Sequence, residues 1–122
     1  MKTTELFKRN IKKTLIAGLI LFVVAIMATF FGLKIWISSE ANTVAEDAVQ
    51  VFHLDKTESL IALIDSEDYS LKARNNAIWA LGVLKDKKAL PKLQLLYTGQ
   101  PCNHDIELCQ YEIEKAIKKI SR

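Results

Sequence analysis

The sequence predicts an all-α protein in which a single transmembrane helix is followed by about five short helices. Two observations predict this fold class. Residues 14–33 form a long uncharged stretch, and the rest of the chain places apolar residues at helical spacing, with no run that alternates every second residue. We therefore expect four regions, which are a basic cytoplasmic tail (1–13), a transmembrane helix (14–37), a polar linker (38–42) and a helical domain (43–122).

The uncharged stretch begins at Thr14 and ends at Leu33. At a rise of 1.5 Å per residue, a helix of this length spans roughly the 30 Å of a bilayer core. A buried helix in a soluble core would need a larger protein around it. A cleaved signal peptide is the closer alternative, because Ser39 and Ala41 place small residues at signal-peptidase spacing. We favour an uncleaved anchor, because the apolar core of a signal peptide is usually shorter.

The basic residues are concentrated before the apolar stretch, where five of the six Lys and Arg of residues 1–37 lie, and only Lys34 follows it before Lys56. Residues 1–37 carry six Lys and Arg against one Glu, a charge of +5, whereas residues 38–122 carry eleven against thirteen Asp and Glu, a charge of −2. Basic flanks favour the cytoplasmic side, so we expect a single-pass protein of the cell (inner) membrane with a cytoplasmic N-terminus and an extracytoplasmic domain. A net-acidic domain also argues against nucleic-acid binding.

Capping signals divide the domain into five expected helices. The first begins at a capping box formed by Thr43 and Glu46. Asp55 and Asp86 are the expected N-caps of the second and fourth, and Gly99 and Pro101 end the fourth. The last helix, from Asp105, should bury one apolar face. The expected ranges are 43–52, 55–65, 69–84, 86–98 and 105–120, and the buried face of the last includes Ile106, Cys109, Ile113 and Ile120.

Two stretches of similar pattern, 60–64 and 93–97, lie 33 residues apart, a period typical of helical solenoids. The segment 65–93 carries a distinctive set of residues: Arg74, Ala77, Ala80, Leu81, Gly82, Leu84, Asp86, Ala89, Leu90, Pro91 and Leu93. With these residues the segment resembles a HEAT repeat of the phycobilisome-lyase-like type. The resemblance implies a right-handed stack of helix pairs, a short HEAT-like α-solenoid that binds protein and has no catalytic residue. Nothing matches a tetrapyrrole-attachment site, so lyase activity does not follow.

Cys102 and Cys109 fall in the expected extracytoplasmic domain, where disulfides persist. Their separation allows a bridge between the last helix and the loop that precedes it, and such a bridge would stabilise a solenoid of only two and a half helix pairs. Three alternatives remain: a metal site with His104 and His53, a redox-active dithiol, and two free thiols. We favour the disulfide, because the spacing fits no standard zinc motif and lacks C-x-x-C.

Two side chains of the third expected helix form the candidate binding surface. Arg74 is expected to pair with an acidic residue of the preceding turn, Asp65, Glu67 or Asp68. Trp79 lies off the main apolar stripe, so it is either packed against a neighbouring helix or an exposed anchor for a partner.

The sequence therefore predicts a non-enzymatic protein with no cofactor, no metal and no small-molecule substrate. Its expected partners are the membrane lipid bilayer and either another protein or a second copy of the chain. The alternative function is that of a small accessory or assembly subunit of a larger membrane complex, in which the transmembrane helix itself makes much of the contact.

Overall fold

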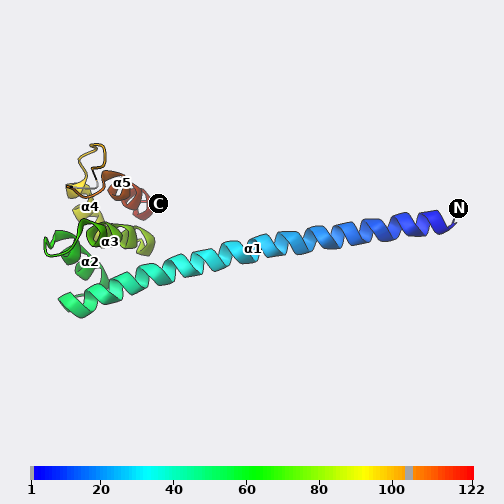
Figure 1. Ribbon diagram of the computed structural model, residues 1–122, viewed down its shortest axis with the longest axis horizontal. Helices are drawn as coiled ribbons and strands as arrows, with labels where there is room; N and C mark the ends of the chain where they lie inside the picture. The colour runs from blue at the N-terminus through cyan, green and yellow to red at the C-terminus, as the bar shows by residue number, and fades with distance from the viewer. Residues whose placement is uncertain (1, 104–105) are drawn as a thin grey trace. The chain divides into compact units, whose positions relative to one another are not determined.

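The computed structural model describes residues 2–103 and 106–122, and for residues 2, 3, 5, 6 and 9 the backbone alone. The chain divides into two units, residues 1–36 and residues 37–122. Every regular element in the described part is helical, so the prediction of an all-α fold is confirmed. The elements are α1 (Lys2–Phe52), α2 (Lys56–Asp65), α3 (Leu71–Leu84), the 3-10 helix η1 (Lys87–Ala89), α4 (Leu90–Leu96) and α5 (Gln110–Ile120), and the five α-helices are labelled in Figure 1.

Helix α1 contains the apolar stretch. By length and composition it is long and apolar enough to cross a membrane. The side chains of residues 10–40 are all exposed, so within the described residues this stretch has no protein core to bury it. Its hydroxyl groups are satisfied inside the helix, since Thr29 Oγ1 donates to the carbonyl of Ile26 at 2.8 Å and Thr14 Oγ1 to that of Asn10 at 3.0 Å. Such internal pairing suits an apolar surrounding.

The structure corrects the predicted linker. Residues 38–42 are helical, and α1 continues through them to Phe52 without the expected start at Thr43. The polar side chains here bond to the helix's own carbonyls: Asn42 Nδ2 donates to Ser38 O at 3.0 Å and Thr43 Oγ1 to Ser39 O at 3.1 Å. Thr43 therefore is not an N-cap. The helix ends where His53 takes a left-handed conformation, with φ 56°.

The second unit has its own apolar core. Helix α3 is at its centre, packed against both α2 and α5, and α4 also packs against α5. The end of α1 contributes a stripe of small buried residues to this core, Ala41, Ala45 and Ala48. Their spacing places them on one face of the helix. The largest fully buried side chains of the core are Leu60, Ile64, Ile78, Leu81, Leu93 and Ile113.

The expected N-cap at Asp55 is confirmed, whereas Asp86 caps the 3-10 helix η1 and not the fourth α-helix, because α4 begins only at Leu90, after Ala89, and has no side-chain cap. Asp55 accepts from the amide of Glu58, and Asp86 accepts from that of Lys88 at the start of η1. The two caps are also linked: Thr57 Oγ1 donates to Asp86 at 2.6 Å, and Lys88 Nζ lies 3.3 Å from Asp55. The hydrogen bond from Thr57 lowers the pKa of Asp86, and the amide of Glu58 lowers the pKa of Asp55. Helices α2 and η1 therefore begin side by side.

The last two helices differ from their expected bounds. Helix α4 ends at Leu96, before Gly99, and α5 begins at Gln110 rather than at Asp105. Cys109 is the N-cap residue of α5 instead of lying one turn inside it. Ile106, expected on the buried face, is 75% exposed. The predicted start at Asp105 itself lies outside the described residues.

Candidate interaction surface

A groove of about 460 Å³ opens on the second unit, between the end of α1, α3 and α5. We call this the Trp79 groove. Its wall contains two carboxylates, two amides, one indole and one aliphatic side chain. The residues that line it are Glu40, Val44, Asn75, Asn76, Trp79 and Glu112.

Trp79 is half-buried in this groove. One part of the residue packs against the apolar core, and another part lines the opening. The sequence left two alternatives for Trp79, a side chain packed against a helix and an exposed one. The structure shows a residue that is packed on one side and exposed on the other. Trp79 lies one helical turn after Asn75, which places both on one face of α3.

The charge of the groove is negative. Glu40 and Glu112 are carboxylates, and no Lys, Arg or His is among the lining residues. Glu112 has an ion-pair partner, Lys115, at 3.5 Å, but both side chains are partly exposed, so the pair contributes little. Glu40 makes no ion pair within the described part of the chain.

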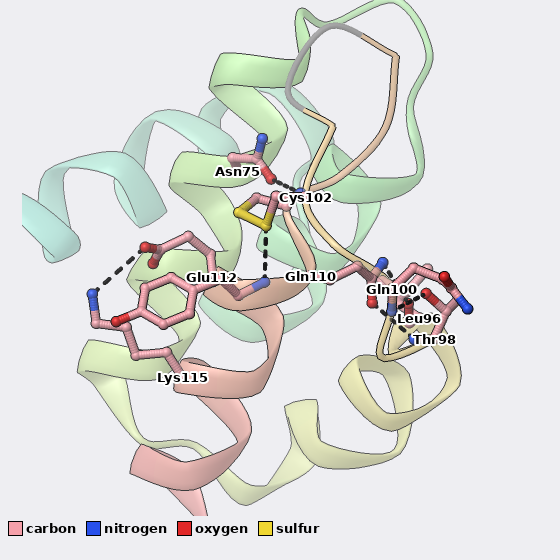
Figure 2. The surroundings of a disulfide bond; sticks show 10 residues. Asn75, Leu96, Thr98, Gln100, Cys102, Gln110, Glu112 and Lys115 are labelled. Carbon is pink, nitrogen blue, oxygen red and sulfur yellow. Dashed lines mark hydrogen bonds and ion pairs between the residues drawn. A yellow bond between two sulfur atoms is a disulfide. The ribbon is translucent and has the colours of Figure 1, made fainter.

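Cys102 and Cys109 lie at disulfide-bonding distance, with their Cα atoms 4.9 Å apart (Figure 2). The separation is inside the range that a bridge requires. Cys109 is buried, and the sulfur of Cys102 accepts from the amide of Tyr111 at 3.1 Å. That amide is one of the unpaired donors of the first turn of α5, so Cys102 caps this helix from the loop.

The same region is tied to its neighbours by two side chains. Asn75 Oδ1, from α3, accepts from the amide of Cys109 at 2.9 Å. Gln110 joins α5 to the end of α4, because its Oε1 accepts from the amide of Thr98 at 2.8 Å and its Nε2 donates to Leu96 O at 3.3 Å (Figure 2). The cysteine pair thus fixes the start of the helix that carries Glu112, a wall of the groove.

Arg74 occupies a different place from the one expected. Its Nε donates to the carbonyl of Ile64 at 2.7 Å, at the end of α2. Asp65, one of the three expected partners, pairs with Lys92 at 2.6 Å. The guanidinium of Arg74 therefore satisfies a free helix-end carbonyl, where a positive charge is favourable. Arg74 is not among the groove residues, so the structure does not bring it together with Trp79.

The described residues contain no group of three or more His, Cys, Asp or Glu that could hold a metal ion. His53, named in the metal alternative, is exposed at the end of α1. His104 lies outside the described residues.

Sequence reasoning missed the groove residues other than Trp79. The available signal was weak: Glu40 and Val44 are one turn apart on one helix, and Asn75 and Trp79 one turn apart on another. Comparisons of the chain with protein-family models, with curated proteins and with solved structures find no match.

Proposed function

We propose that this chain is a membrane-anchored, non-enzymatic helical-repeat protein that binds another protein, or a second copy of itself, on the extracytoplasmic side. The observation that carries the proposal is the contrast within α1. Residues 10–40 are exposed along their whole length, whereas Ala41, Ala45 and Ala48 are buried in the core of a small helical unit. One helix thus offers an apolar surface to a bilayer and also anchors a folded unit.

The repeat interpretation draws support from the neighbours of each helix. Helices α2 and α3 form one pair, α4 and α5 form another, and α3 packs against α5. The linked caps at Asp55 and Asp86 hold the start of α2 beside η1, the 3-10 helix that leads into α4. Stacked helix pairs of a solenoid have these neighbour relations, and such stacks commonly bind proteins on their surfaces.

The orientation rests on charge. Five Lys and Arg precede the apolar stretch, whereas Lys34 alone follows it before Lys56, and this bias favours a cytoplasmic N-terminus. The close cysteine pair is in keeping with an oxidising compartment.

Cross-linking of the full-length protein in its native membrane, followed by extraction in a mild detergent, tests the proposal. We expect a defined protein to be captured, either a partner or a second copy. Exchange of residues 14–33 for an unrelated apolar segment of equal length separates the two candidate functions. Capture that survives the exchange assigns binding to the helical unit. Capture that is lost, with the protein still in the membrane, favours an accessory subunit held by its span, and no capture with either protein contradicts both.

A further inference from the structure

The Trp79 groove combines an aromatic ring with carboxylates, and none of its lining residues is a cation. We propose that it binds an arginine side chain from an extended basic segment of a protein partner. This inference rests on the proposed function, because it names the chemistry that the partner presents to the helical unit.

Charge complementarity is the first argument. Glu40 and Glu112 approach the groove from different helices, α1 and α5, so their charges act on the same space. Residues 38–122 carry a net charge of −2, which adds a weak attraction for a basic segment. Lys115 holds Glu112 only through a long and partly exposed pair, which an incoming cation can replace.

The shape and chemistry of the wall favour arginine over lysine. A guanidinium is planar, stacks on an indole ring and donates several hydrogen bonds in one plane. The groove is lined by the half-buried Trp79 and by side chains that carry carboxylate and amide oxygens, those of Glu40, Asn76 and Glu112. The ammonium of lysine uses the charge of such a site but not its planar geometry.

The chain provides its own spectroscopic reporters. It has two tryptophans, Trp79 in the groove and Trp36 in α1, so two indole N–H signals are expected in the spectrum of the ¹⁵N-labelled full-length protein. The peptide Ac-Gly-Arg-Gly-NH2 is titrated into the protein in maltoside micelles, whose headgroup carries no competing cation. We expect the Trp79 signal to shift in a saturable manner with a millimolar dissociation constant, while that of Trp36 stays unchanged.

Matched peptides and variants test the assignment. The citrulline peptide, which keeps the shape of the arginine peptide without its charge, should bind to the wild-type protein about tenfold more weakly. The double variant Glu40→Gln/Glu112→Gln should bind the arginine peptide about tenfold more weakly, since each lost carboxylate weakens binding about threefold. The variant Asp47→Asn/Glu67→Gln removes the same charge from exposed positions outside the groove and should bind normally. Melting curves of both variants confirm that they are folded.

Three results would overturn the inference: no shift at Trp79, an equal response to the citrulline peptide, or undiminished binding by the groove variant. The titration requires no natural partner. If it fails while cross-linking in the membrane succeeds, the groove assignment is wrong and the proposed function stands.

Discussion

Gly82 of α3 lies directly against Ala116 of α5. A Cβ atom added to Gly82 would be 2.9 Å from the Cα of Ala116 and 3.1 Å from its Cβ. The absence of a side chain therefore lets the two helices approach closely, and α3 is also the helix that carries Trp79 and Asn75. The distance between α3 and α5 sets one dimension of the groove.

We expect Gly82→Ala to lower the free energy of unfolding by about 1 to 3 kcal/mol, because the new methyl group meets backbone that cannot rotate away. Helix propensity alone would stabilise the variant by up to about 1 kcal/mol, so the contact decides the sign. Thermal unfolding of the full-length protein in detergent measures the effect. Gly18→Ala is the control, since nothing lies within 4 Å of its Cβ position. An unchanged or higher melting temperature for Gly82→Ala would contradict the close packing.

The cysteine pair predicts sensitivity to reduction. A bridge that closes so short a loop stabilises by about 2 to 3 kcal/mol in the chain-entropy model. A reductant should therefore lower the melting temperature of the wild-type protein and leave that of Cys102→Ser/Cys109→Ser unchanged. Alkylation followed by mass spectrometry gives an independent check. Wild-type thiols that react fully without a reductant would show that no bridge is present.

The bond from Thr57 to Asp86 predicts a dependence on pH. The pKa of Asp86 is lowered in the folded protein, chiefly by the Thr57 hydroxyl, so its stabilising contribution is present above the ordinary value of 3.8. That contribution is lost as the pH falls through the lowered pKa. Thr57→Val should cost about 1 kcal/mol at neutral pH and less in acid, where Asp86 is protonated.

Carboxyl NMR titration tests the same contact directly, because the pKa of Asp86 should rise toward its ordinary value in Thr57→Val. Thr43→Val serves as the control, since Thr43 is exposed and bonds only to its own helix. A pKa of Asp86 that is equal in the wild type and in Thr57→Val would be inconsistent with this hydrogen bond.

Arg74→Gln should lower the free energy of unfolding by about 1 kcal/mol, because the carbonyl of Ile64 loses its charged donor. The variant should still bind Ac-Gly-Arg-Gly-NH2 with wild-type affinity, since Arg74 does not line the groove. Parallel melting and peptide titration separate these effects. Weakened peptide binding by a stably folded Arg74→Gln variant would show that Arg74 is part of the binding surface.

Local signals in the sequence predicted much of the fold. Asp55 and Asp86 act as caps because an aspartate accepts amide bonds from residues that follow it closely in the chain. The prediction that a helix begins at Thr43 was wrong for a related reason. A capping box looks the same whether the preceding residues are helical or not, and here Asn42 and Thr43 bond backward along the helix and let it continue.

The start of α5 and the groove depend on contacts between distant residues. Asn75 accepts from the amide of the N-cap residue Cys109, and Cys102 from that of Tyr111 in the first turn, and these contacts place the start of α5 at Gln110. Glu40 and Glu112 are separated by most of the domain sequence, so no local pattern links them with Trp79. The proximity of Cys102 and Cys109 could be predicted from the sequence, because only a short loop separates the two residues.

Thiol labelling in intact cells tests the central claim, that the apolar part of α1 anchors the helical unit outside the cytoplasm. Cells that express the full-length protein are treated with a membrane-impermeant maleimide, with or without an impermeant reductant. The account predicts that Cys102, the less buried cysteine of the pair, is labelled in intact cells once the pair has been reduced. Labelling that appears only after the cells are permeabilised would place the unit in the cytoplasm and contradict the account.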